Sequence, residues 1–285
     1  MKVLFSNSLR IGAVLLGSSA LCLAKEHTAV SQGAYKLSHI GGLPITNAMV
    51  TGWAISLLLI VMVRCLVGQK PKLVPTKGQL FVETAVEAMK NLLAPIVGTK
   101  VIDHAFPILI GFFSFILIHN WSGLLPGVGT FGFWDNTGHL LYFFRPANSD
   151  LNTTLGLSIV AMVAWAYIVL RYEGFKSFVS HLFGNKADRK EVPFLIYSFL
   201  FFIFIMVGLI ECVSILFRLV SLSFRLYGNV FGGESLLSTI QGISKFVLPV
   251  PFYFLEVLIG AIQAFVFTLL LAVYIGLVCN HEEAH

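Results

Sequence analysis

Charged side chains interrupt the two longest apolar stretches of the chain. Arg225 lies within the segment SFRLYGNVFGGE, Glu234 ends that segment, and Glu256 lies in the apolar stretch that follows. A guanidinium does not release its proton in proteins, whereas a carboxyl group binds and releases one, and burial shifts carboxyl pKa values upward toward neutrality. These residue types therefore predict a fixed positive charge close to groups that can pass protons.

Arg225 shares one face of a helix with several small or polar side chains. With about 3.6 residues per turn, residues three, four and seven apart fall on the same side of a helix. Phe217, Val220 and Phe224 fall in a broad apolar sector opposite, and Glu234 faces away from Arg225 toward a different neighbour. The other members of the Arg225 face are Glu211, Arg218, Ser221, Asn229 and Gly232.

The last apolar stretch carries a second polar stripe at the same helical spacing. Its acidic member, Glu256, is near the external end of this helix, and Glu234 is near the external end of the preceding helix. We therefore expect the two carboxylates to meet at the external side of a helical hairpin, with Glu211 toward the internal side. The stripe consists of Glu256, Gly260, Gln263, Phe267 and Tyr274.

The position of Arg225 requires an explanation, because a charge at the centre of a bilayer costs roughly 2.5–3.5 kcal/mol even on the lenient insertion scale. Snorkelling to the surface suits Arg64, near the end of its segment, better than Arg225. The structural alternative is an ion pair of Arg225 with Glu211 or Glu234. Glu234 faces the wrong way for that pair, and Glu211 lies about 20 Å along the helix axis. The pattern favours a functional role for Arg225.

The composition is that of an integral membrane protein. Of 285 residues, 57% are hydrophobic and 12% are charged, and the mean hydropathy is +0.86. Its apolar segments have the length of helices rather than of barrel strands. We predict an all-α membrane protein with about five transmembrane helices and one amphipathic surface helix, the last two spans forming a long tilted hairpin. The spans are expected at roughly 47–67, 104–125, 151–170, 193–242 and 245–279, and the surface helix at 76–94.

The distribution of basic residues predicts the topology. The loops GQKPKLVPTKG and RYEGFKSFVSHLFGNKADRK are strongly basic and so are expected inside. Residues 1–24 are expected to be a cleaved signal peptide, with an uncleaved first helix as the alternative. Residues 25–46 then form an external N-terminal segment, residues 47–285 the polytopic membrane domain, and residues 193–279 the hairpin that carries the site. The N-terminus is predicted outside and the C-terminus in the cytoplasm.

Several other patterns do not predict sites. GVGTFG at 127–132 has the spacing of a dinucleotide loop but no βαβ unit around it. The four cysteines stand singly in apolar runs, and His281 with His285 lies in a polar tail. The net charge of +5 comes from loops between apolar segments. We therefore predict no nucleotide site, cofactor, metal or nucleic-acid partner for this chain, and no catalytic chemistry of its own.

Four motifs together resemble subunit a of the F-type ATP synthase, the stator of its membrane proton channel. They are SLSFRLYGNVFGGE, FLEVLIGAIQAF, HNWSGLLPG and RPANSDLNTTL, and the similarity covers roughly residues 35–280. The form resembles bacterial members. The resemblance implies a multi-pass protein of the bacterial inner membrane that couples proton flow to rotation of a ring of c subunits. It also implies as partners b-type peripheral stalk subunits, the rest of the F1Fo complex and the lipid bilayer.

The resemblance also assigns roles to individual residues. Arg225 matches the arginine that faces the carboxylate of the rotor ring. Glu234 and Glu256 match the pair that lines the external half-channel, where some members carry a histidine with a glutamate, and two carboxylates there should titrate as a coupled pair. The remaining matches are Asn229 and Gln263 beside the arginine, Ser221 and Glu211 on the internal half-channel, and Asn148, Asp150 and Asn152 at the external entrance. Arg218, also on the expected proton path, occupies a position where members of the family often carry a basic residue.

Two other function classes compete with this one. A secondary transporter could use Arg225 to bind an anionic substrate, but it would be expected to show internal repeats and broken helices, which the sequence lacks. A structural subunit of a respiratory complex could bind quinone or haem. Haem would require paired histidines at membrane depth, where only His119 is expected.

Overall fold

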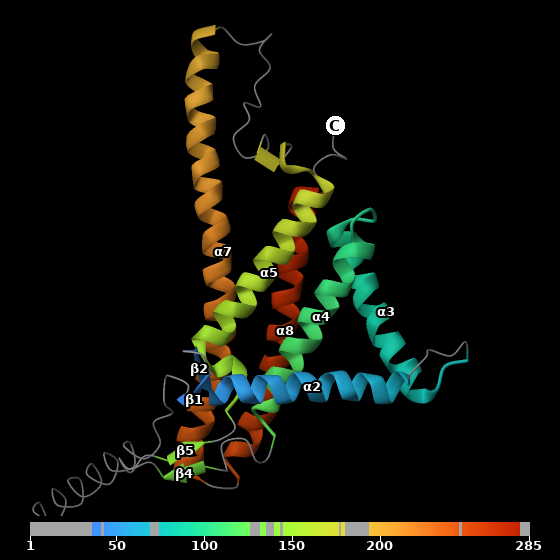
Figure 1. Ribbon diagram of the computed structural model, residues 1–285, viewed down its shortest axis with the longest axis vertical. Coiled ribbons are helices and arrows are strands. Elements are labelled where there is room, and N and C mark those ends of the chain that lie inside the picture. The colour runs from blue at the N-terminus through green and yellow to red at the C-terminus, as the bar shows by residue number, and fades with distance from the viewer. Residues whose placement is uncertain are drawn as a thin grey trace, which may run out of the picture.

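The computed structural model describes residues 36–40, 43–68, 74–125, 132–134, 140–142, 145–176, 178–179, 194–244 and 247–279. Helices form most of this part of the chain (Figure 1). They are α2 (Asn47–Val67), α3 (Lys77–Val97), α4 (Ile102–Ser122), α5 (Leu151–Tyr172), α7 (Phe194–Ile243) and α8 (Pro249–Cys279), with the short 3-10 helix η1 (Ala147–Ser149). Among the described residues five helices, all of these except α3 and η1, are long and apolar enough to cross a membrane. The predicted all-α membrane fold is confirmed.

The helices begin where the sequence offers capping groups. Thr46, Thr76 and Asp150 each accept a hydrogen bond from a backbone N–H two or three residues later, at the starts of α2, α3 and α5. Such caps satisfy N–H groups that have no partner within the helix. The last helix begins at Pro249, a few residues after the predicted start at 245, because a proline fits the first turn, where its missing N–H is not needed.

α2 contacts the rest of the molecule mainly at its N-terminal end. Asn47, Ala48 and Thr51 are buried there, whereas the large apolar side chains from Trp53 to Leu66 are exposed. A helix of 21 residues with apolar side chains exposed all round has the length and the surface of a lipid-facing span. α2 is therefore a candidate membrane-spanning helix.

α7 is too long to cross a bilayer along the membrane normal. It has 50 residues, which corresponds to about 75 Å, against a hydrocarbon core of about 30 Å. Figure 1 shows α7 running across α2, and the axis of α8 lies closer in direction to that of α7 than to that of α2. A helix much longer than the membrane is thick is accommodated by tilting. α7 and α8 thus form the long tilted hairpin that the sequence predicted.

The core forms around α8, which is enclosed by α3, α4, α5 and α7. Phe267 and Leu271 on α8 are fully buried, and the ring of Phe267 lies 5.9 Å from that of Phe112 on α4. The indole of Trp165 on α5 donates a hydrogen bond to the carbonyl oxygen of Tyr274 at 2.9 Å. These contacts hold α8 between its neighbours.

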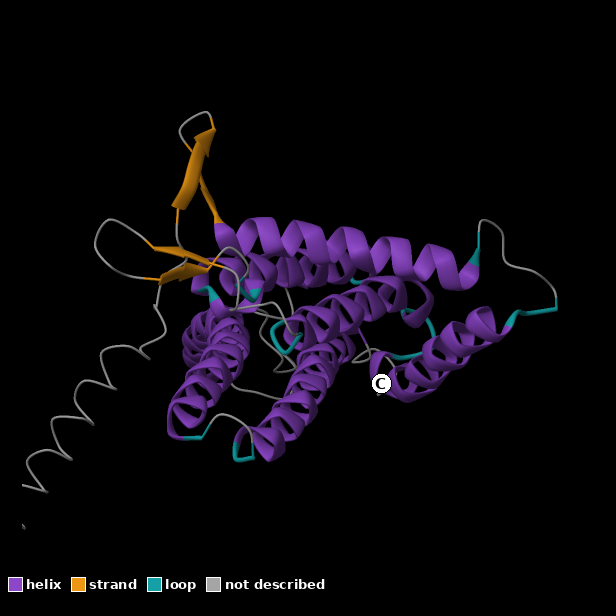
Figure 2. Cartoon of the chain, turned by 90° about the horizontal axis from the view of Figure 1, so that it is seen from below, coloured by secondary structure: helices purple, strands orange, loops and turns teal. Residues whose placement is uncertain are grey.

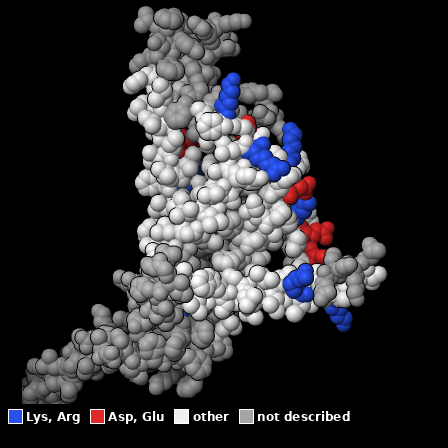
Figure 3. Space-filling view, in the orientation of Figure 1, with Lys and Arg blue, Asp and Glu red and all other residues white. Residues whose placement is uncertain are grey.

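α3 differs from the other helices in its charge. Val86, Met89 and Leu93 pack toward the core, while Glu87 and Lys90 are exposed, as predicted for an amphipathic surface helix. In the view of Figure 3, charged side chains gather along one edge, over α3 and the neighbouring helix ends, and most of the other described surface that faces the viewer is uncharged. This edge lies toward the C-terminal end of α2.

Two small antiparallel hairpins lie at the opposite end and were not predicted. β1 (Lys36–Ile40) pairs with β2 (Leu43–Thr46), and β4 (Gly132–Trp134) pairs with β5 (Leu140–Tyr142). Figure 2 shows both pairs beyond the N-terminal end of α2. They lie in segments that the sequence predicted only as an external segment and a loop, because strands this short give almost no periodic signal. The predicted signal peptide, most of the GVGTFG motif and the C-terminal tail fall outside the described residues.

Candidate functional site

Arg225 lies on the outer flank of α7. Leu222, Leu226 and Val230 form the buried side of the helix, whereas Arg225 is exposed beside Phe224, which is 53% exposed. Within the described ranges no hydrogen bond or ion pair joins its guanidinium to another residue. A permanent cation at membrane depth is therefore presented outward, toward whatever covers this flank of α7.

The amide side chains of the two predicted stripes meet one turn from Arg225. Asn229 Nδ2 donates a hydrogen bond of 2.7 Å to Gln263 Oε1, which joins α7 to α8. Gln263 is buried, and its Nε2 has no hydrogen-bond partner among the described residues. Because Asn229 follows Arg225 by four residues, the two side chains lie about 6 Å apart along the helix axis.

The carboxylates of Glu234 and Glu256 lie at the same end of the hairpin. The carboxylate of Glu256 rests against the backbone of Gly233, the residue directly before Glu234. Only the absence of a side chain at Gly233 makes room for it, since a Cβ there would overlap the carboxylate. Both groups are partly buried. The arrangement therefore brings two acidic residues together at one end of the hairpin.

Glu211 and Glu234 each pair with a cation other than Arg225. Arg218 Nη2 lies 3.3 Å from Glu211 Oε1, and its guanidinium sits 4.7 Å above the ring of Tyr274. Glu234 Oε2 lies 3.7 Å from the Nε of Arg145. The alternative ion pairs of Arg225 with these two carboxylates therefore do not form. Ser221 lies on the same exposed flank as Arg225.

Asn148 and Asp150 are both buried beside the start of α5. Asn148 Nδ2 donates 2.8 Å to Asn120 Oδ1, and Asn120 Nδ2 donates 3.1 Å to the carbonyl oxygen of Gly260 on α8. Asp150 is occupied as the N-cap of α5, and Asn152 is exposed. The predicted residue Asn148 is thus connected to α8 through Asn120, a residue that the sequence did not single out.

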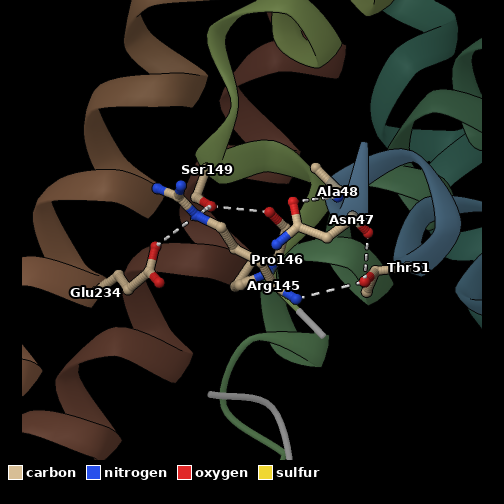
Figure 4. A network of polar contacts seen from close by, with 7 residues as sticks. All are labelled: Asn47, Ala48, Thr51, Arg145, Pro146, Ser149 and Glu234. Atoms are coloured by element: carbon tan, nitrogen blue, oxygen red, sulfur yellow. Dashed lines mark hydrogen bonds and ion pairs between the residues drawn. The ribbon is translucent and has the colours of Figure 1, made fainter. Parts of the chain in front are cut away.

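Arg145 is the other residue that the sequence did not identify. Arg145 is 6% exposed. Figure 4 shows it between α2 and α7, close to Ser149, with Glu234 directed toward it. Its Nε donates 2.8 Å to Ser149 Oγ. A signal was available for both missed residues: Asn120 is an uncharged polar residue within an apolar helix, and Arg145 is the first basic residue after a long loop that has none.

No metal centre is present in the part of the chain that the structure describes, where no group of three or more His, Cys, Asp or Glu residues is close enough to hold an ion. The site is instead a sequence of single polar groups. It runs from Arg145 and Glu234, past Glu256 and the Asn148–Asn120 pair, to Gln263 and Asn229 beside Arg225. Such groups can bind, orient and pass protons.

A family model described as "ATP synthase A chain" matches residues 49–276. The chain belongs to the ATP synthase A chain family. It is a proton-translocating stator subunit of the Fo sector of an F-type ATP synthase. Membership of this family decides against the two competing function classes, the secondary transporter and the respiratory-complex subunit.

Curated relatives in this family match the subunit over most of its length. It is 32% identical over 260 residues to ATP synthase subunit a of Gloeobacter violaceus, covering 90% of this chain and 94% of the relative. It is 30% identical over 241 residues to ATP synthase subunit a of Moorella thermoacetica, with 85% and 94% covered. It is also 30% identical to ATP synthase subunit a of Trichlorobacter lovleyi, with 84% and 89% covered.

Proposed function

We propose that this subunit forms two proton half-channels that meet the rotor on either side of Arg225, and that Arg225 is the charge that separates them. The observation that carries this proposal is the position of Arg225, exposed on an apolar flank of α7 with no ion-pair partner among the described residues. A cation at membrane depth is costly unless it faces a water-filled cavity or a neighbour that supplies a counter-charge. The carboxylates of a c-ring would supply it.

The exposed flank of α7 suits close approach by a helical rotor. Ser221, Gly228 and Gly232 lie on this flank near Arg225 and are exposed, and a Cβ added at either glycine would meet nothing within 4 Å. Small residues at helix interfaces in membranes allow backbones to come close together. A c-ring helix packed here would bring its carboxylate within reach of Arg225.

The outer half-channel is assigned to the polar groups at the hairpin end of the molecule. A proton would enter past Asp150 and Asn148, reach Glu234 and Glu256, and pass Gln263 and Asn229 to a carboxylate of the ring. The support is the placement of the last four of these groups along α7 and α8, with the 2.7 Å bond between Asn229 and Gln263 nearest to Arg225. The ring would then carry the neutral carboxyl group into lipid.

The inner half-channel is assigned to the opposite side of Arg225. Ser221 lies one turn before Arg225, and Glu211 lies further along the same helix, paired with Arg218. After nearly a full rotation the ring carboxyl group would release its proton there. Arg225 prevents direct passage between the two half-channels because a guanidinium neither releases a proton nor lets another cation pass close by. Each proton crossing contributes about 2.3 kcal/mol per 100 mV.

The distribution of charge supports one orientation of the subunit in the membrane. Because basic segments favour the cytoplasmic side, the charged edge of Figure 3 and the C-terminus would lie in the cytoplasm. The N-terminus and the two hairpins then lie outside. The membrane would be a bacterial inner membrane, and b-type stalk subunits would hold the subunit against rotation, as the resemblance to subunit a implies.

The test is Arg225→Ala in membrane vesicles that carry the complete synthase. We expect assembly to be retained and ATP-driven proton pumping to be lost, while vesicles stripped of the F1 sector still conduct protons passively, because the barrier rather than the pathway has been removed. Arg171→Ala, which removes an exposed arginine at the end of α5, is the matched control and should pump normally. Normal ATP-driven pumping by Arg225→Ala would contradict the proposal.

A further inference from the structure

A buried arginine, Arg145, lies beside Glu234 and has no role in the pathway described above. Its side chain is 7% exposed, and its Nε lies 3.7 Å from Oε2 of Glu234, whose side chain is 26% exposed. That oxygen is buried and accepts no hydrogen bond among the described residues. The charge of Arg145 is therefore the main described compensation for burying this part of the carboxylate.

Three elements hold Arg145 in position (Figure 4). Its Nε donates 2.8 Å to Ser149 Oγ, which in turn donates 2.9 Å to the carbonyl oxygen of Pro146. Its backbone N–H donates 3.4 Å to Thr51 Oγ1 on α2. A Cβ added to Gly123 would lie 2.8 Å from Pro146 Cγ, so the segment is also packed tightly against the end of α4. The guanidinium is fixed independently of α7, which carries Glu234.

The separation of the two charges is informative. Hydrogen bonds between charged groups have donor–acceptor distances of about 2.7–2.9 Å, so a pair 3.7 Å apart is held by charge alone. A tight two-bond clamp would oppose protonation of the carboxylate at all times. A looser contact orients the carboxylate and still lets it take and release a proton, while Arg145, which keeps its own proton, cannot intercept it.

Stability alone does not account for this arrangement. A buried ion pair generally stabilises a fold no more than apolar residues of similar size would, although removing one partner is destabilising. The other charged group at this end, Glu256, lies against Gly233 next to Glu234. Two neighbouring carboxylates repel each other when both are ionised, and a fixed cation beside one of them offsets that repulsion.

We propose that Arg145 is a positioning residue of the outer half-channel: it fixes the orientation of the Glu234 carboxylate and balances its charge, so that Glu234 can exchange protons beside Glu256. The proposal rests on the proposed role of Glu234. It concerns a contact between residues 89 positions apart that no sequence pattern revealed. Arg145 acts through Glu234 and does not itself carry protons.

The experiment measures ATP-driven proton pumping per assembled complex in vesicles carrying Arg145→Gln, Arg145→Lys, Glu234→Gln or the double variant Arg145→Gln/Glu234→Gln. We expect Arg145→Gln to reduce the pumping rate roughly tenfold, which corresponds to an interaction free energy within the range measured for residues in contact. Arg145→Lys should recover part of the loss because it keeps the charge. The double variant should pump no more slowly than Glu234→Gln alone. Arg171→Gln, at an exposed site, serves as the control for loss of an arginine.

Each outcome decides for or against the proposal. Three results would overturn the proposal. They are a double variant in which the two single losses of pumping rate multiply, normal pumping by Arg145→Gln, and equal pumping by Arg145→Lys and Arg145→Gln. If Arg145→Gln does not assemble, the double variant decides: recovery of assembly supports the pair, because the unpaired buried carboxylate has been removed, and continued failure refutes it. Full pumping by Glu234→Gln would instead contradict the proposed function of Glu234.

Discussion

Replacing Gly233 with alanine should slow proton pumping without weakening the protein. The Cβ added at this position would overlap the carboxylate of Glu256, because the two would be closer than 3.0 Å, a separation that Cβ atoms in proteins essentially never show. The obstacle is the far end of a flexible side chain, so the helices need not move. To regain ordinary van der Waals contact, the carboxylate must shift by roughly 1 Å or more.

Two effects of opposite sign follow from this geometry. Alanine favours a helix interior over glycine by about 1 kcal/mol, so the stability of the subunit should be unchanged or slightly increased. Displacing a reacting group by about 1 Å can reduce a rate by up to 100-fold, and we expect ATP-driven proton pumping to fall roughly tenfold. A merely structural role for Gly233 would make stability and pumping fall together.

The assay compares pumping rates in inverted vesicles with the temperature at which the detergent-solubilised complex dissociates. Gly111→Ala on α4 is the matched control, because a Cβ there would meet nothing within 4 Å and so gives the helical gain without displacing a carboxylate. In a Glu256→Gln background the additional Gly233→Ala change should slow pumping little further. Equal pumping by Gly233→Ala and Gly111→Ala would refute the reasoning.

Two further predictions concern the same end of the hairpin. Glu256→Gln keeps the size of the side chain but cannot bind and release a proton, so pumping should slow while assembly measured by subunit yield stays near normal; an unchanged pumping rate would remove Glu256 from the pathway. Asn120→Leu leaves the amide of Asn148 and the carbonyl of Gly260 without their present partner, at about 1–3 kcal/mol for each buried group, so the solubilised complex should dissociate at a lower temperature. An unchanged dissociation temperature would show that the hydrogen bonds of Asn120 contribute little to stability.

The outline of the fold was predictable because its signals are local. A transmembrane helix can be recognised from about 20 consecutive apolar residues, and capping residues such as Thr46 and Asp150 mark where helices begin. The tilt of the last hairpin was predicted, and the length of α7 alone requires it. The two hairpins β1–β2 and β4–β5 escaped prediction, since their strands have only three to five residues each.

The candidate site was predictable in its residues and less so in its pairings. Helical periodicity placed Arg225 and Asn229 on one face of a helix and Gln263 on a stripe of the next, and the structure joins Asn229 to Gln263. Periodicity also separated Arg225 from Glu234. It could not supply the partner of Glu234, because Arg145 belongs to a segment with no regular pattern of its own.

The sequence by itself therefore determined that this is a helical membrane protein with a permanent cation at membrane depth and two acids near one end of its last hairpin, because length, hydropathy and helical spacing depend only on neighbours along the chain. Tertiary structure decided which polar groups meet across different elements. Arg145 reaches Glu234 and Asn120 reaches Gly260 across 89 and 140 positions, and such contacts depend on how the helices cross and pack. Only the folded arrangement could leave Arg225 on the open flank of α7 while each of the other two arginines near the hairpin's acids, Arg145 and Arg218, has a carboxylate partner.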